Sequence, residues 1–284
     1  MIANTRRIVI RADRKWWDLE VRDLLNYKDL LFLLVRKDFV TSYKQTVLGP
    51  IWVVLQALMG SAVFAVIFGK IAGIETNGHP AFLFYLVGNL AWNYFASVFG
   101  TGCNSLQSNI HLFSKVYFPR LIPPIADAVS KLINFLIQFL VYILALGFYH
   151  STYPAPDSGI LIEAILLPLL VLQIAVLGLG LGFIVSAVSV KYRDLSRFAG
   201  LATQFLMYAT PVIYPISEIP KAYQFWMAWN PLTFIVESFR YLLLGSASGC
   251  TIEYALPSIG MTVMILLIGV ILYNNCQRNY VDYA

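Results

Sequence analysis

The sequence has little charge. Only 12% of its 284 residues are charged, whereas a typical soluble domain has about 25%. Apolar residues make up 59% of the chain, and the mean hydropathy is +0.70. Water cannot wet a surface of this composition. The composition therefore excludes an ordinary soluble domain and indicates that much of the surface faces lipid.

The sequence also lacks the usual motifs of catalysis and metal binding. The three cysteines form no CxxC pair, and none of the three histidines belongs to an HExxH helix. No G-x-x-x-x-G-K-[ST] loop, the common phosphate cradle of ATPases, occurs anywhere in the chain. We therefore expect no catalytic residue, no metal site and no cofactor in this chain. If ATP drives its activity, a separate chain must bind ATP and Mg²⁺.

Long apolar stretches are present instead, and they predict an all-α membrane protein. A spanning helix needs roughly 20 apolar residues. Six stretches qualify, at about 48–68, 82–103, 132–149, 164–190, 198–216 and 257–274. They predict a transmembrane domain over 48–276, preceded by a cytoplasmic segment over 1–47 and followed by a tail over 277–284. The first segment has no apolar h-region, so it does not read as a cleavable signal.

The distribution of lysine and arginine predicts the orientation. Seventeen of the 20 basic residues fall before the first span, after the last span or in alternate connections. Cytoplasmic loops of membrane proteins carry such an excess. Both termini are therefore predicted to be cytoplasmic, and the basic net charge of +5 is a topology signal rather than a sign of nucleic-acid binding.

Leu30–Lys44 combines an apolar run with charge. Val35, Phe39 and Tyr43 recur every four residues and so share one helical face. This pattern favours an N-terminal amphipathic helix lying in the cytoplasmic interface, with a plain soluble helix as the alternative. Its candidate functional residues are Arg36, Lys37, Asp38, Phe39, Tyr43 and Lys44.

Residues 217–253 are predicted to lie on the outer side. Trp226–Leu244 is apolar enough for a seventh span, but Pro231 interrupts it, and Glu237 and Arg240 are spaced to pair on a helix. A charged pair at mid-bilayer is costly, and a seventh span would place the tail outside. We therefore predict a re-entrant helical hairpin, which a membrane tolerates where protein surrounds it. Its candidate residues are Trp226, Trp229, Glu237 and Arg240.

The predicted cytoplasmic loop over 105–126 is unusually apolar for a connection. Exposed aromatic residues mixed with arginine suggest a surface that binds a partner, although aromatic anchoring at the lipid headgroups is an alternative. A cluster of prolines ends any helix there. The candidate residues for coupling to a partner are His111, Leu112, Phe113, Lys115, Tyr117, Phe118 and Arg120.

Aromatic residues make up 15% of the chain. Their faces suit the apolar faces of sugar rings, but aromatic belts and core packing explain most such residues. The candidates for a channel wall are Trp52, Tyr85, Trp92, Tyr94, Phe95, Phe99, Gln204 and Tyr208.

Uncharged polar residues also interrupt the spans, and they either line a polar path or join helices by hydrogen bonds. Joining is favoured for most of them. They are Gln56, Asn89, Asn134, Gln138, Gln173 and Gln204. The spans carry no chain of buried acids, which argues against proton-coupled transport.

Four blocks of sequence resemble one family. The stretch RKDFVTSYKQTVLGPIWVVLQ (Arg36–Gln56) resembles the opening of ABC transporter permeases that export O-antigen, capsule and teichoic acid. SKVYFPRLIPPIAD (Ser114–Asp127), KYRDL (Lys191–Leu195) and NPLTFIVESFRYLLLG (Asn230–Gly245) are similar to later blocks of the same family. The blocks occur in order, and the resemblance covers the chain from about Leu30 onward.

The resemblance implies a transport subunit of the bacterial inner membrane rather than an enzyme. It implies a homodimer of permeases with two copies of a separate ABC ATPase, and a lipid-linked polysaccharide as substrate. The loop around His111–Arg120 would dock on the ATPase, and the outer hairpin would form a lid. A drug or small-molecule ABC exporter is the nearest alternative, followed by an ATP-independent secondary transporter or channel. A membrane enzyme ranks below these, because the carboxylates predicted outside are scattered.

Overall fold

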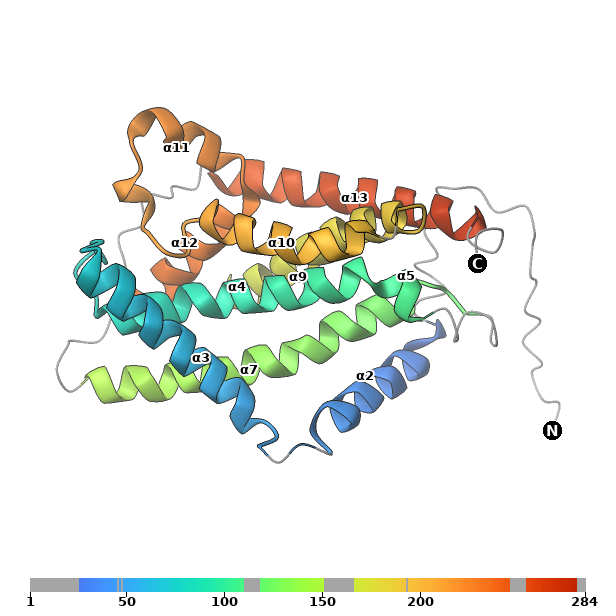
Figure 1. Cartoon of the computed structure of the whole chain (residues 1–284), viewed down its shortest axis with the longest axis horizontal. Helices are drawn as coiled ribbons and strands as arrows, with labels where there is room; N and C mark the ends of the chain where they lie inside the picture. The colour runs from blue at the N-terminus through green and yellow to red at the C-terminus, as the bar shows by residue number, and fades with distance from the viewer. Residues whose placement is uncertain are drawn as a thin grey trace.

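The computed structural model describes residues 26–44, 46, 48–109, 118–150, 166–192, 194–245 and 254–279. Every regular element in these ranges is helical, as predicted. Figure 1 shows the long helices running side by side along one axis, with α11 at one end of the bundle and α5 at the other. We call these the α11 end and the α5 end.

Five helices in the described ranges are long and apolar enough to cross a membrane. They match five of the six predicted spans, with ends that shift by up to ten residues. They are α3 (Ile51–Phe64), which continues as a π-helix, η1 (Ala65–Ile71), and α4 (Ala81–Cys103), α7 (Ile122–His150), α9 (Leu167–Ser189) and α13 (Ala255–Asn279).

The predicted span 198–216 is not a full-length helix. Helix α10 covers Asp194–Tyr208, which gives a rise of about 22 Å, less than the roughly 30 Å of a bilayer core. The chain then turns through 209–215 before a short 3₁₀ helix, η3 (Ile216–Glu218). Pro211 and Pro215 explain the break, since proline lacks an N–H and keeps the residue before it out of the helical region. The count of six spans therefore stays a prediction.

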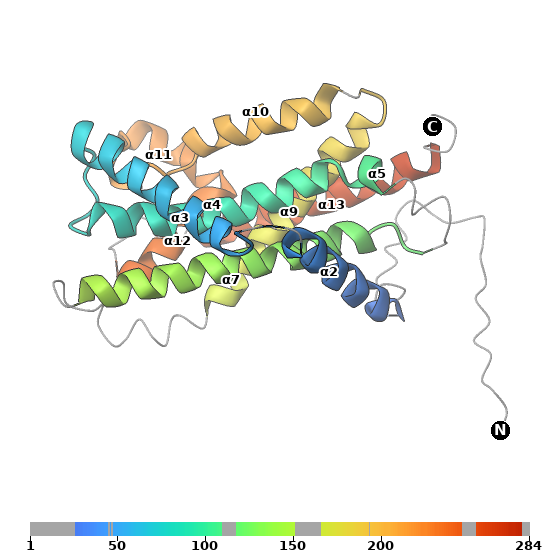
Figure 2. The same ribbon diagram turned by 60° about the horizontal axis from the view of Figure 1, so that its bottom comes forward.

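Helix α4 forms the centre of the bundle. It packs against α3, α7, α9, α10 and α12 (Pro231–Leu244). In the most apolar stretch of each helix, 78% of the α4 residues are buried, against 11% for α3. Figure 2 shows α3 and α10 on the outside of the bundle with α4 beneath them. The protein thus has a buried central helix and outer helices with largely open faces.

The predicted outer hairpin is helical. Helix α11 (Lys221–Ala228) and helix α12 are joined by Trp229 and Asn230. Pro231 does not break a longer helix but occupies the first turn of α12, where a missing N–H costs nothing. The side chain of Asn230 caps α12 by accepting a hydrogen bond from the Leu232 N–H at 3.1 Å.

The predicted amphipathic segment is also a helix, α2 (Lys28–Tyr43). Leu34 anchors it in a small apolar cluster with Phe118, Ile122 and Ala126, close to the start of α7. Its other apolar side chains include Phe32, which is 70% exposed. The helix therefore has one face on the bundle and one apolar face left open.

Candidate functional site

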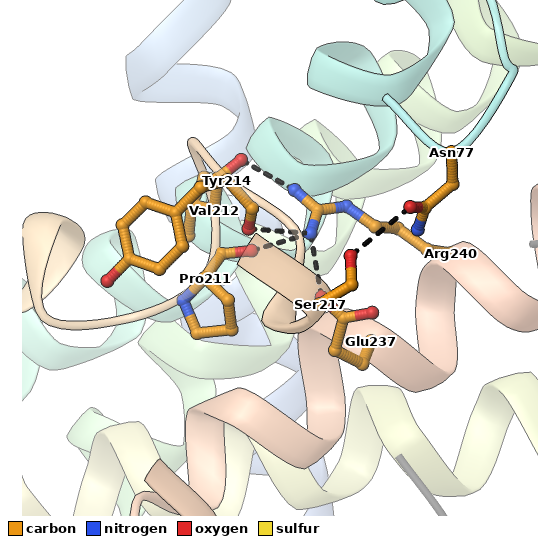
Figure 3. A network of polar contacts seen from close by, with 7 residues as sticks. All are labelled: Asn77, Pro211, Val212, Tyr214, Ser217, Glu237 and Arg240. Atoms are coloured by element: carbon orange, nitrogen blue, oxygen red, sulfur yellow. Dashed lines mark hydrogen bonds and ion pairs between the residues drawn. The ribbon is translucent and has the colours of Figure 1, made fainter. Parts of the chain in front are cut away.

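A fully buried arginine lies at the broken end of α10. The guanidinium of Arg240 donates from Nη1 to the carbonyl oxygens of Pro211 at 2.7 Å and Tyr214 at 3.3 Å, and from Nη2 to that of Val212 at 2.6 Å. Nη1 also contacts Glu237 Oε1 at 2.9 Å. Figure 3 shows these groups converging on one guanidinium. Arg240 thus satisfies the carbonyls that the helix break leaves without partners.

Helix α4 supplies the other wall of this network. The Arg240 guanidinium carbon lies 3.7 Å from the centre of the Phe84 ring, a cation–π contact. Gly88 makes room for the turn, because a Cβ there would lie 3.0 Å from the Val212 carbonyl oxygen. The pairing of Glu237 with Arg240 that the sequence predicts is confirmed, but the spacing gave no indication that the arginine also holds the end of α10.

Both ends of α12 are tied to spanning helices. Ser258 on α13 donates to the Pro231 carbonyl at 3.1 Å, and the Tyr142 hydroxyl on α7 donates to the Leu243 carbonyl. At the α11 end, Ser217 donates to Asn77 in the loop between α3 and α4 at 3.3 Å (Figure 3). Helix α12 is therefore fixed at both ends, and Arg240 fixes one of its faces to α4 and to the turn after α10.

A polar groove is the second feature of the site. A cavity of about 520 Å³ lies between α3, α4, α7 and α10. A second cavity of about 540 Å³ lies at the junction of α2 and α3 and shares Val53, Gln56 and Asn134 with the first. The two cavities adjoin one another at these residues. The polar side chains of the first cavity are Gln56, Asn89, Asn93, Ser97, Lys131, Asn134 and Gln138.

Most of the predicted intramembrane amides join helices. Asn89 on α4 donates to Ser61 on α3 at 3.2 Å. On the opposite side of the bundle, Gln173 on α9 donates to Ser258 at 2.9 Å and Thr262 at 3.3 Å, both on α13. Asn134 and Gln138 also make such bonds, and both line the polar groove together with Gln56 and Asn89. Asn89, Asn134 and Gln138 therefore both join helices and line the groove, whereas Gln173 only joins helices and Gln56 only lines the groove. Gln204 lies exposed on α10.

The groove contains two residues that were not among the predicted site residues, Asn93 and Lys131. Asn93 donates to the Gln138 amide oxygen at 3.2 Å. A periodic signal was available, because Asn89, Asn93 and Ser97 recur every four residues, which places them on one face of α4. Lys131, Asn134 and Gln138 are three and four residues apart, which places them on one face of α7. Polar periodicity within each helix therefore indicated these two polar faces, but not that they meet in one groove.

The predicted interface helix reaches the groove through Tyr43. Its hydroxyl donates to the Asn134 side chain, and burial raises the pKa of Tyr43, which keeps that donor protonated. Phe39 contacts the Tyr43 ring at 5.0 Å between centroids. The Asp38 carboxyl lies close to that of Asp127. Arg36, Lys37 and Lys44 are exposed.

The aromatic candidates for a channel wall divide into two groups. Tyr85, Trp92, Tyr94, Phe95 and Phe99 are buried in the core around α4, as the core-packing interpretation expects. Of these, only Trp92 and Tyr94 reach the polar groove. The others, Trp52 and Tyr208, are 55% and 61% exposed, and Trp52 lines the second cavity.

Two further predicted sites are placed only in part. Residues 110–117 lie outside the described ranges, and with them His111, Leu112, Phe113, Lys115 and Tyr117. Phe118 is buried in the cluster with Leu34, and the Arg120 carbonyl accepts a hydrogen bond from the Tyr273 hydroxyl at 3.4 Å. In the outer hairpin, Trp226 and Trp229 are 72% and 50% exposed.

Comparison with known proteins gives one consistent result. Residues 29–244 match the family model of the ABC-2 type transporter. The O-antigen export system permease protein RfbA of Myxococcus xanthus is 28% identical over 254 residues, which cover 89% of this chain and 91% of that protein. A Klebsiella pneumoniae protein of the same name is 26% identical, covering 89% and 94%. The polysialic acid transport protein KpsM of Escherichia coli is 24% identical, covering 88% and 93%.

Proposed function

The chain belongs to the ABC-2 type transporter family, and from this premise we propose that it is the permease subunit of an ATP-driven polysaccharide exporter. The observation that carries the proposal is the match over almost the whole length to permeases named for O-antigen and polysialic acid. The polar groove supports it, because amides and aromatic rings at membrane depth suit a hydroxyl-rich cargo. The substrate is a lipid-linked polysaccharide carried across the bacterial inner membrane.

The energy comes from a partner. The chain lacks a phosphate-binding loop, so two copies of an ABC ATPase bind ATP and Mg²⁺ on its cytoplasmic side. Two copies of the permease form the path. The open faces of α3 and α10 support this dimer, because Met59 and Phe205 are 65% and 70% exposed on them.

Helix α10 and the turn that follows complete a sixth crossing. The helix alone is about 22 Å long, and residues 209–216 continue toward the α11 end, where Arg240 satisfies their carbonyls in place of a helix. Six crossings place both termini in the cytoplasm, in agreement with the distribution of basic residues. The α5 end is then cytoplasmic, and α11 with α12 forms a re-entrant outer hairpin.

Loss of the chain tests the function directly. In cells that lack it, we expect surface polysaccharide to disappear and its lipid-linked precursor to accumulate inside the cell. A plasmid copy of the wild-type gene restores export. Unchanged polysaccharide on the surface of the deletion strain, measured by immunoblot of whole cells, would refute the proposal.

The loop between α5 (Ser105–Ser108) and α7 carries the motion of the ATPase. Changing Phe113, Tyr117 and Phe118 together to alanine should uncouple ATP hydrolysis from export, reducing export at least tenfold while the chain still inserts. Phe118→Ala alone serves as a control, since this side chain packs against Leu34 within the permease and its loss reports on stability rather than docking. Normal copurification of the ATPase and normal export in the triple variant would contradict the coupling role.

A further inference from the structure

Two neighbouring cavities lie along α3. The second cavity, at the α2–α3 junction, is lined by Ser42, Thr46 and Trp52. The polar groove lies further into the bundle, where Phe64 and Asn89 line it. Under the topology proposed above, the second cavity is on the cytoplasmic side of the groove, beside the interface helix.

The chemistry of the groove is that of a site for neutral sugars. Lys131 is its one charged side chain among the described residues, and it lies close to the carboxyl of Asp127. The remaining polar groups are amides and hydroxyls, which both donate and accept, as the hydroxyls of a sugar do. The rings of Trp92, Phe64 and Phe135 add apolar faces. An acidic polymer would find no row of cations to neutralise it.

Asn93 and Gln138 have hydrogen-bonding capacity to spare. Their mutual bond uses one N–H of Asn93 and the oxygen of Gln138. Each amide has two donors and two acceptor sites, and in the described part of the chain no other side chain bonds to either amide. The remaining groups are therefore available to a ligand or to water in the cavity that they line.

We propose that this groove binds a stretch of a neutral, hydroxyl-rich sugar chain, with Asn93 and Gln138 as its central hydrogen-bonding pair. This inference rests on the proposed export function and narrows it to a substrate class. It places a sugar subsite within each protomer, between α3, α4, α7 and α10. The amides in this groove then serve the cargo as well as the packing of the helices.

Binding can be measured on the purified full chain in lipid nanodiscs. The probes are maltoheptaose and a mannose heptamer as neutral sugars, and a galacturonic acid heptamer as the acidic one. The readout is tryptophan fluorescence, and Trp92→Phe identifies the contribution of the groove. We expect a saturable change with the neutral probes, and about tenfold weaker binding in Gln138→Leu. Gln173→Leu is the matched control, since this glutamine joins α9 to α13 away from the groove; it should bind like the wild type.

The outcomes separate this inference from the export function. No response to either neutral probe, equal binding in Gln138→Leu and wild type, or preference for the acidic probe would each overturn the sugar subsite. Melting curves identify variants that have lost their fold. For a misfolded Gln138→Leu, Gln138→Met replaces it, because methionine keeps an unbranched side chain of similar length but has no amide; the same loss of binding is expected. Failure of the subsite leaves the result of the deletion strain unaffected, whereas a deletion strain with normal surface polysaccharide refutes the export function even if the groove binds sugar.

Discussion

Replacing Arg240 by methionine is expected to destabilise the protein by about 3–5 kcal/mol, the cost of removing one partner of a buried ion pair. Methionine has a similar length but no charge, so the buried carboxylate of Glu237 would lose its counterion. The carbonyls of Pro211, Val212 and Tyr214 would lose their donor in the same step. The loss of stability is measured by thermal unfolding of the purified variant, with size-exclusion chromatography as the readout of the folded fraction.

Two companion variants separate the charge from the carbonyl contacts. Adding Glu237→Gln to Arg240→Met removes the stranded carboxylate, so stability should recover in part. Arg240→Lys keeps the charge, but one ammonium group cannot reproduce the planar guanidinium that reaches three carbonyls and a carboxylate together. The stability of Arg240→Lys should therefore lie between those of the wild type and Arg240→Met. If the double variant regains full stability, the ion pair alone matters and the carbonyl contacts contribute nothing.

The network also places a mechanical constraint on export. The turn over 209–215 continues the helical hydrogen bonds of α10 only at Ala209, whose N–H donates to the Phe205 carbonyl. Arg240 fixes the turn to α12 and to Phe84 on α4. Helix α12 is itself tied to α7 and α13. Movement of the outer hairpin therefore requires either that the turn moves with it or that the guanidinium releases its carbonyls. A stable Arg240→Lys variant with altered export would indicate the second case.

The sequence predicted the spans well where apolar length alone decides the structure. Five long helices appear close to their expected positions, because an apolar stretch of about 20 residues has few options in a bilayer. The predicted end of the helix at residue 216 was wrong, because apolar composition continues past its actual end at Tyr208. The sequence showed Pro211 and Pro215 there. However, Arg240, which bonds the carbonyls that the break leaves without helical partners, lies 29 residues after Pro211.

The sequence also could not predict which helix packs against which. Core packing and aromatic belts were the favoured explanation for most aromatic residues, but composition could not show which residues of α4 line a channel. The structure places α4 at the centre, so Phe95 and Phe99 stack on each other in the core. The same limit applies to the polar groove. Gln56 and Gln138 were visible as polar residues, but their meeting in one cavity depends on how three helices pack.

The second large effect is expected where α4 and α9 touch. A Cβ on Gly182 would lie 2.8 Å from the Cα of Gly102 and 3.2 Å from the backbone N of Cys103. Because these are backbone atoms, no rotamer change can relieve the contact, and the helices must separate. Gly178 and Gly182 form the small-xxx-small spacing that allows such close approach in membranes.

Gly182→Leu should therefore destabilise the protein by about 3 kcal/mol, the upper range of overpacking, and Gly182→Ala by less. Gly100→Ala on α4 is the matched control, since a Cβ there meets nothing within 4 Å. It should be neutral or stabilising by up to about 1 kcal/mol, because glycine weakens a helix interior. Thermal melting in one detergent compares all three. Equal stability of Gly182→Leu and Gly100→Ala would mean that α4 and α9 are not in backbone contact, and the central position of α4 would then have to be abandoned.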